Sequence, residues 1–126
     1  MLDCKSCNTP STTDKRLSIL DGTLLADPLQ YRSLEGALQY LTLTRPDINF
    51  AVNYVCQFVH APTDSHLLLV KRILRYLKGT IDAGITLSAG DITSISGYSN
   101  SDWARCPDTR LSTSGFCVFL GSSLIC

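Results

Sequence analysis

Residues 31–80 read YRSLEGALQYLTLTRPDINFAVNYVCQFVHAPTDSHLLLVKRILRYLKGT, and this stretch decides the fold. Its apolar residues recur at three- and four-residue steps, which places them on one face of a helix. The spacing predicts three helices, over residues 29–44, over residues 46–61, and from residue 63 or 64 to residue 79. Helices of this length can cover one another's apolar faces, so we predict a compact helical unit. The residues expected on the buried faces are Tyr31, Leu34, Leu38, Leu41, Ile48, Ala51, Val52, Val55, Val59, Leu67, Val70, Ile73, Leu74 and Leu77.

Prolines and capping residues mark the ends of these predicted helices. Pro46 suits a first helical position, because the N–H that it lacks would have no partner there. Pro62 ends the second helix, since the residue before a proline is pushed out of helical geometry. Thr63 or Asp64 supplies an N-cap for the third helix, and Gly79 is a suitable stop.

One side of the third predicted helix is basic, because Lys71, Arg75 and Lys78 share it and Arg72 lies beside them. A solvated surface explains this cluster, since cations in the last turn suit the negative end of a helix. A phosphate-contacting face explains it as well, since Lys and Arg gathered along one helix are typical of nucleic-acid-binding proteins. Spacing alone favours the solvated surface. The four cations are nevertheless the candidate nucleic-acid-binding residues.

The overall composition limits the classes of function. The 126 residues include 11 Lys and Arg and 11 Asp and Glu, so the formal net charge is zero. A dedicated nucleic-acid binder is usually more basic, so any such function has to come from local clustering. The chain has no run of about eighteen apolar residues, which a membrane span needs, and its first residues lack a signal-peptide pattern. We expect neither membrane insertion nor secretion.

The six cysteines are expected to be reduced thiols. No secretory signal is recognised, and Cys56 and Cys117 lie in apolar runs, so an intracellular reducing compartment is favoured. Cys4 and Cys7 form a Cys-x-x-Cys pair, but a structural zinc site needs four ligands. No second Cys or His pair lies at a suitable spacing, so we predict no metal site. The remaining cysteines are Cys106 and Cys126.

The segments on either side of the helical unit differ in character. Residues 1–28 are polar and irregular, so we expect an extended or mobile leader. After residue 80 the apolar period changes to two, which predicts strands over residues 85–88, 92–99 and 112–120, with a further strand beginning at residue 124. The predicted fold class is therefore α+β. A sheet that stops partway leaves an unpaired edge, and such an edge invites self-association.

The motifs of the chain resemble those of Ty1/copia-type retrotransposon Pol polyproteins. Residues 31–48 match the family pattern Y-R-S-L-x-G-x-L-x-Y-L-x-x-T-R-P-D-I, and residues 71–80 match K-R-I-L-R-Y-L-K-G-T. Residues 4–10 fit the linker pattern C-K-x-x-x-T-P. These matches correspond to the C-terminal part of the reverse transcriptase. Residues 97–121, GYSNSDWARCPDTRLSTSGFCVFLG, resemble the opening of the ribonuclease H domain that follows it.

The resemblance implies an organisation in three parts. Residues 1–28 would be a linker, and residues 29–80 a thumb-like or connecting region that grips the primer–template. Residues 81–126 would be a truncated, antiparallel, ribonuclease H-like sheet. In this arrangement Lys71, Arg72, Arg75 and Lys78 face nucleic acid, with an RNA–DNA hybrid as the expected partner.

The resemblance also implies that catalytic parts are missing. The polymerase motif Tyr-x-Asp-Asp does not occur in the chain. Ribonuclease H relatives of this family carry Y-S-D-x-D-W, whereas residues 98–103 read YSNSDW, so Asn100 stands at the first Asp position. Asp102 is either a vestigial catalytic carboxylate or a turn cap, and the turn cap is favoured. The intact family would use magnesium to activate water; for this chain we expect no cofactor.

Three hypotheses follow. The favoured one is a catalytically incomplete fragment of a Ty1/copia polyprotein. The second is a non-enzymatic module that binds RNA–DNA or another nucleic acid through the basic helix over residues 71–78. The third is that the chain is enzymatic as part of a longer product.

Overall fold

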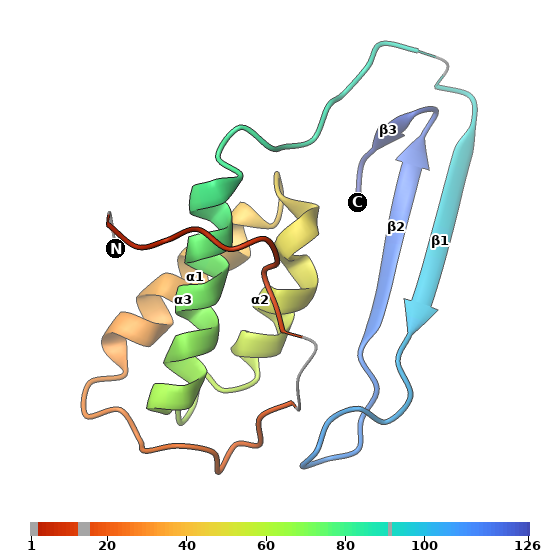
Figure 1. The fold of residues 1–126 in the computed structure, drawn as a ribbon. Helices are drawn as coiled ribbons and strands as arrows, with labels where there is room; N and C mark the ends of the chain where they lie inside the picture. The colour runs from red at the N-terminus through yellow and green to blue at the C-terminus, as the bar shows by residue number, and fades with distance from the viewer. Residues whose placement is uncertain (1–2, 13–15, 91) are drawn as a thin grey trace. The chain divides into compact units, whose positions relative to one another are not determined.

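The computed structural model describes residues 3–12, 16–90 and 92–126. Two units divide the chain, Met1–Ala83 and Gly84–Cys126. Within these described residues, three helices and an antiparallel three-stranded sheet confirm the predicted α+β class. The elements in chain order are α1 (Leu29–Leu41), the 3-10 turn η1 (Pro46–Ile48), α2 (Asn49–Cys56), α3 (Asp64–Gly79), β1 (Ile95–Ser101), β2 (Ser114–Leu120) and β3 (Ser123–Leu124) (Figure 1).

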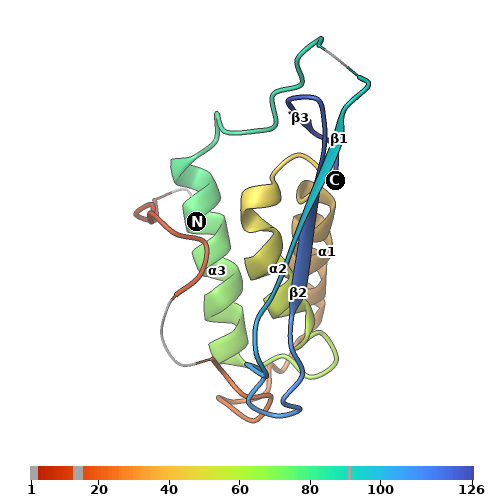
Figure 2. The same ribbon diagram turned by 90° about the vertical axis from the view of Figure 1, so that its right-hand side faces the viewer.

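The first unit is built on the packing of α1, α2 and α3, which lie side by side (Figure 2). Their buried apolar residues form one cluster, and helical spacing predicts every member of it except Phe58. Among the described residues no helix has the length and apolar character that crossing a membrane requires. The cluster consists of Tyr31, Leu38, Ile48, Ala51, Val52, Val55, Phe58, Val70 and Ile73.

Two helices are shorter than predicted. The first ends at Leu41 rather than residue 44, and the second ends at Cys56 rather than residue 61. Beyond Cys56 the chain forms tighter turns, in which Phe58 N–H donates to the Val55 carbonyl at 3.2 Å. Hydrogen bonds from residue i to residue i−3 form 3-10 turns, which continue the coil of the chain without the i to i−4 bonds of an α-helix. Phe58 is therefore carried into the core by a turn.

The third helix begins with a capping box in which histidine takes the usual place of Glu or Gln. Thr63 Oγ1 accepts the His66 N–H at 3.3 Å, and His66 Nδ1 accepts the Thr63 N–H at 3.1 Å. His66 is fully buried, and its ring stacks on Phe58 with 3.8 Å between centroids. Since Nδ1 accepts a hydrogen bond, Nε2 carries the proton and donates to the Ser18 carbonyl at 3.1 Å. Thr63, one of the two predicted caps, is the N-cap.

The second unit is an antiparallel sheet in the order β1-β2-β3. Tyr98 of β1 faces Cys117 of β2, and all seven residues of the edge strand β1 are exposed. The strand predicted over residues 85–88 does not form. Instead, the Ser88 N–H donates to Ser123 Oγ at 3.1 Å, and that hydroxyl donates back to the Ser88 carbonyl at 3.3 Å. A side chain thus satisfies the backbone groups that a strand ladder would have used.

Candidate nucleic-acid interface on helix α3

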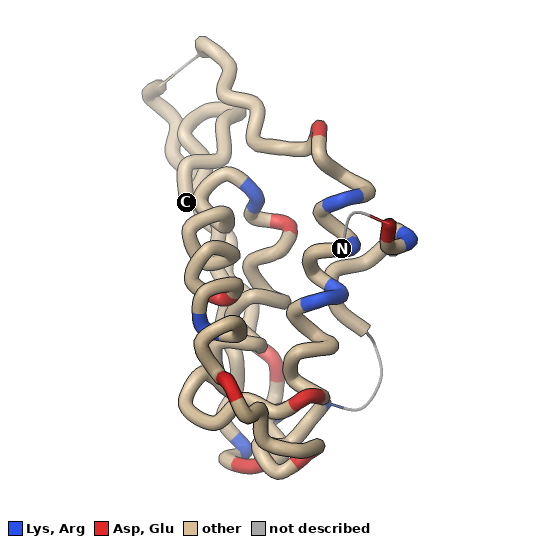
Figure 3. Tube along the Cα trace, turned by 90° about the vertical axis from the view of Figure 1, so that its left-hand side faces the viewer, with Lys and Arg blue, Asp and Glu red and all other residues tan. Residues whose placement is uncertain are grey.

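The four predicted cations lie on α3 as expected from their spacing. Lys71 and Lys78 are exposed, while Arg72 and Arg75 are half-buried. The only acidic residue of α3 is Asp64, in its first turn, so the C-terminal half carries positive charge alone. Figure 3 shows these basic positions recurring along the helix. We call Lys71, Arg72, Arg75 and Lys78 the cation row.

The N-terminal leader lies on the cation row. Figures 1 and 2 show the leader running beside α3. The Cys7 N–H donates to the Arg75 carbonyl at 3.4 Å, and Cys7 Sγ donates to the Arg72 carbonyl at 3.4 Å. We call residues 4–9 the leader strap. The leader was expected to be extended or mobile; within its described residues it is irregular but docked, and residues 1–2 and 13–15 lie outside the described part.

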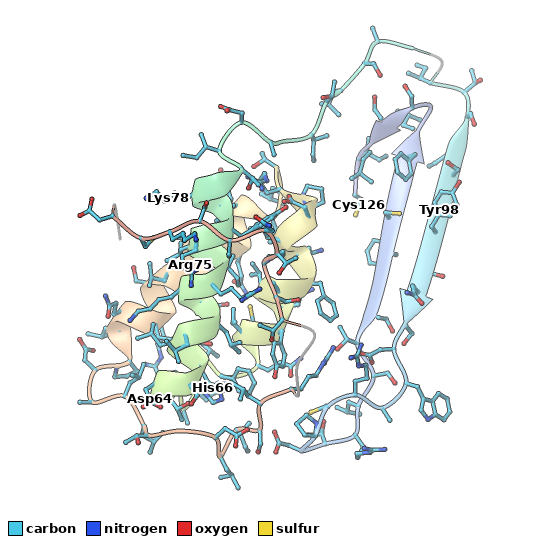
Figure 4. All side chains as sticks on the ribbon, in the orientation of Figure 1. Asp64, His66, Arg75, Lys78, Tyr98 and Cys126 are labelled. Atoms are coloured by element: carbon cyan, nitrogen blue, oxygen red, sulfur yellow. The ribbon has the colours of Figure 1, made fainter. Side chains whose placement is uncertain are left out.

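Three side chains of the cation row donate hydrogen bonds to the leader strap. Lys78 Nζ donates to the Cys4 carbonyl at 2.9 Å, and Arg75 Nε donates to the Lys5 carbonyl at 2.7 Å. Figure 4 shows Arg75 and Lys78 where the leader crosses the helix. Arg72 Nη2 donates to Thr9 Oγ1 at 2.8 Å. The strap therefore offers three neutral oxygen atoms to three of the four cations.

The strap approaches the end of α3 closely because residue 79 is glycine. A Cβ atom at Gly79 would lie 3.0 Å from the Ser6 Cβ, which is tighter than ordinary van der Waals contact. The contact leaves no space between strap and helix at this point. Sequence reasoning identified Gly79 only as a helix stop.

Two groups of the cation row are not satisfied by the strap. Lys71 is exposed and makes no hydrogen bond or ion pair within the described residues. Arg72 Nε is buried without a hydrogen-bond partner among those residues. The row therefore keeps one cation without a strap contact and one unfilled donor.

Asn100 and Asp102, the candidate ribonuclease H positions, both serve the β1–β2 hairpin. Asp102 Oδ1 accepts the Thr113 N–H at 2.7 Å, and the Asp102 N–H donates to the Thr113 carbonyl at 3.1 Å. Asn100 Oδ1 accepts the N–H of the next residue, Ser101, at 2.9 Å. Asp102 thus acts as the turn cap that sequence reasoning favoured.

The donor set around these two residues does not fit a magnesium site. Magnesium prefers carboxylate oxygens in octahedral geometry. Here one carboxylate is paired with an amide, and one oxygen of each is engaged with a backbone N–H. No group of three or more His, Cys, Asp or Glu side chains comes together in the described part of the chain.

A clamp that sequence reasoning missed joins η1 to the end of α3. The Arg45 guanidinium donates to both oxygens of Asp47, at 2.9 and 2.7 Å, and to the carbonyl and hydroxyl of Thr80, at 2.8 and 2.7 Å. Tyr76 Oη donates to Asp47 Oδ2 at 2.8 Å. The signal was present in the two family motifs, since T-R-P-D-I contributes Arg45 and Asp47 while Y-L-K-G-T contributes Tyr76 and Thr80.

The clamp shifts the protonation equilibria of its members. The hydrogen bond from Arg45 lowers the pKa of the Asp47 carboxyl. The same bond raises the pKa of Arg45, and the hydrogen bond to Asp47 raises the pKa of Tyr76. Each shift favours the charge state in which the clamp is closed.

A second polar cluster joins α1 to α2, with Glu35 buried, Cys56 half-buried and Gln39 exposed. Cys56 Sγ donates to Glu35 Oε1 at 2.7 Å, and Gln39 Nε2 donates to Cys56 Sγ at 3.1 Å. Glu35 is not among the residues that helical spacing places on the buried face, yet it is only 7% exposed. Burial, and then the hydrogen bond to Glu35, raises the pKa of the Cys56 thiol to about 11. The thiol therefore stays protonated and unreactive at neutral pH. All six cysteines are unpaired.

Comparison with known proteins identifies the family. The chain is 49% identical to the retrovirus-related Pol polyprotein from transposon RE1 of Arabidopsis thaliana, over 96% of this chain and 8% of that polyprotein. It is 50% identical to an uncharacterized mitochondrial protein of the same plant, over 99% of this chain and 52% of that protein. A second uncharacterized mitochondrial protein of this plant is 46% identical, over 62% of this chain and 70% of that protein.

These relatives define a class of transposon-encoded polyproteins and proteins similar to parts of them. The chain belongs to the family of Ty1/copia-type retrotransposon Pol polyproteins. It spans about half the length of the first mitochondrial relative and a small part of the RE1 polyprotein. No family model matches the chain, and no solved structure matches it.

Proposed function

We propose that the chain is the segment of a Ty1/copia Pol polyprotein that runs from the C-terminal part of the reverse transcriptase into the start of a ribonuclease H-like domain. We further propose that this segment has no catalytic activity by itself. The observation that carries the second point is the use of Asp102 as a hairpin cap, with Asn100 where the family pattern has aspartate.

Phosphodiester hydrolysis of the ribonuclease H type needs clustered carboxylates that hold divalent ions around the attacking water. An amide brings no negative charge to such ions. The Asp102 carboxylate would also have to share its Oδ1 atom with the Thr113 N–H, which it accepts at 2.7 Å. The pair therefore supplies too little charge to assemble a metal-dependent nuclease.

The test is hydrolysis of an RNA–DNA hybrid by the purified chain in magnesium buffer. We expect no cleavage above that of buffer alone. The matched variant is Asp102→Asn, because an amide oxygen can still accept the Thr113 N–H while the charge is removed. Magnesium-dependent cleavage that disappears in Asp102→Asn would contradict the proposal. Cleavage gained by Asn100→Asp alone would show that the amide at this position is what removes activity and that the hairpin role of Asp102 does not prevent it.

A second candidate function is nucleic-acid binding without catalysis. One observation favours it: from Lys71 to its end α3 carries four cations and no acidic residue, and Lys71 is accessible. Binding of this kind rests on phosphate contacts, so its affinity falls steeply with salt.

Fluorescence anisotropy with a labelled RNA–DNA hybrid tests this candidate. We expect the double variant Lys71→Glu/Arg75→Glu to weaken salt-sensitive binding. The control is Arg32→Glu, which reverses an exposed charge on α1, away from the cation row. Unchanged binding in the double variant, or an equal loss in the control, would rule out the cation row as the interface.

A further inference from the structure

The cation row is contacted by a segment of its own chain, the leader strap. We propose that it is a phosphate-binding surface on which the leader strap and a nucleic-acid backbone exclude each other. The docked strap would leave the exposed Lys71 and Lys78 as the accessible contacts, and its displacement would expose Arg72 and Arg75 and free Lys78 from the Cys4 carbonyl. This inference rests on the second candidate function above and adds how that site is controlled.

The strap uses the same donors that a phosphate backbone would use. Lys78, Arg75 and Arg72 follow at three-residue steps, which are about 4.5 Å apart along a helix axis. Each of them donates to one strap oxygen, at 2.7–2.9 Å. A row of cations that receives a row of oxygen atoms from an extended chain is the arrangement in which a nucleic-acid strand would also be held.

Phosphate oxygens would be stronger acceptors than those of the strap. The three strap oxygens belong to two carbonyls and one hydroxyl, which carry no formal charge. A phosphate oxygen carries negative charge and so adds a Coulombic attraction to the cations that the neutral strap oxygens lack. A guanidinium can also bind a phosphate with two N–H groups at once. Arg72 Nε has no partner among the described residues, so the strap leaves part of that fork unused.

The strap keeps its place because it belongs to the same chain. An intramolecular segment acts at an effective concentration in the millimolar range for a short flexible linker. The strap also contacts the helix backbone directly, because the Cys7 N–H donates to the Arg75 carbonyl and Ser6 approaches Gly79 closely. A nucleic-acid strand cannot occupy the same space. Binding to the three cations therefore requires that the strap leave.

The salt dependence of binding counts the phosphates that are contacted. For B-form DNA the slope of log K against log salt is about −0.9 per neutralised phosphate. With the strap docked we expect a slope of about −1.8, from the exposed Lys71 and Lys78, and with the strap released a slope of about −3.6, from all four cations. The advantage of the released form should then grow about twelvefold as salt falls from about 200 to about 50 mM.

The variant that releases the strap is Cys7→Pro/Thr9→Val in the full chain. Proline removes the N–H that bonds to Arg75 and the thiol that bonds to Arg72, while valine removes the acceptor of Arg72. The cation row itself is unchanged. The matched control is Asn8→Pro, because the Asn8 N–H donates no hydrogen bond within the described residues. Far-ultraviolet circular dichroism verifies that both variants retain their helices.

The binding assay compares the three proteins with a labelled RNA–DNA hybrid and a DNA duplex of the same sequence. A steeper slope in the release variant, with the control like the unmodified chain, supports the proposal. Equal slopes and affinities in all three proteins overturn it while leaving nucleic-acid binding intact. Absence of binding in all three removes the underlying function as well, so the two failures can be told apart.

A second measurement needs no variant. Hydrogen exchange of the Cys7 amide reports whether the strap is docked, because that amide is bonded to Arg75. Linkage requires that a ligand which excludes the strap also loosens it. Saturating RNA–DNA hybrid should therefore speed exchange at Cys7 in the unmodified chain. Slower or unchanged exchange under saturation would overturn mutual exclusion.

Discussion

Replacing Arg45 should destabilise the helical unit more than any surface arginine does. Arg45 is 5% exposed and makes four hydrogen bonds, two to Asp47 and two to Thr80. We count about 1 kcal/mol for each bond to Thr80. The pair with Asp47 adds only about 1 kcal/mol, because the Asp47 side chain is 37% exposed and water can replace part of the interaction. The expected loss for Arg45→Ala is therefore about 3 kcal/mol, at the low end for breaking a buried ion pair.

Urea unfolding followed by far-ultraviolet circular dichroism measures this loss. For a unit of this size about 3 kcal/mol lowers the melting temperature by about 12–24 °C. Arg45→Lys keeps the charge but loses the planar fork, so about half of the loss should remain. The control is Arg32→Ala, since Arg32 is exposed and bonds to two carbonyls in the turns that follow α2. If Arg45→Ala and Arg32→Ala both stay within about 0.5 kcal/mol of the unmodified chain, the clamp does not hold α3.

Three further predictions concern groups with defined protonation or capping roles. The lowered pKa of Asp47 stabilises the folded chain above pH about 4, and this stabilisation is lost as pH falls through the folded pKa. The free energy of unfolding, measured by urea titration, should therefore fall less steeply with acid in Asp47→Asn than in the unmodified chain. His66→Gln keeps a capping acceptor and should cost about 1 kcal/mol, whereas His66→Ala also loses the stack on Phe58 and should cost about 3 kcal/mol; equal melting temperatures would contradict the capping box. The Cys56 thiol, with its pKa of about 11, should react with iodoacetamide about a hundredfold more slowly at pH about 8 than Cys106, whose pKa is lowered by its hydrogen bonds from residue 109; peptide mass spectrometry reads both rates.

The helical core could be predicted from sequence because helix periodicity is a local property. The burial of residues such as Tyr31, Val55 and Val70 can be predicted because apolar neighbours lie three and four positions away from them. The same reasoning did not predict the burial of Phe58 and Glu35. Phe58 is buried from a turn that has no helical period, and Glu35 is buried because Cys56, on another helix, supplies a donor for its carboxylate.

The positions of the candidate residues could be predicted from sequence, but their contacts could not. Spacing placed the cation row on one side of α3, and the Asn100 substitution was visible in the YSNSDW motif. The strap contacts join residues 63 to 74 positions apart, such as Arg72 with Thr9 and Lys78 with Cys4. No local pattern encodes a pairing at that distance. The leader's composition indicated an irregular segment correctly, but composition says nothing about where such a segment docks.

The separation between strap and helix also has a consequence for synthesis on the ribosome. Residues 4–9 are made before α3, and their partners in that helix follow only about 65 residues later. At about 5–20 residues per second, this interval lasts about 3–13 s. Throughout that time the leader has no helix to dock on, and a nascent chain that ends before Arg72 cannot form the strap contacts. Docking of the strap is therefore a late event in the folding of the first unit, after α1 and α2 have already been made.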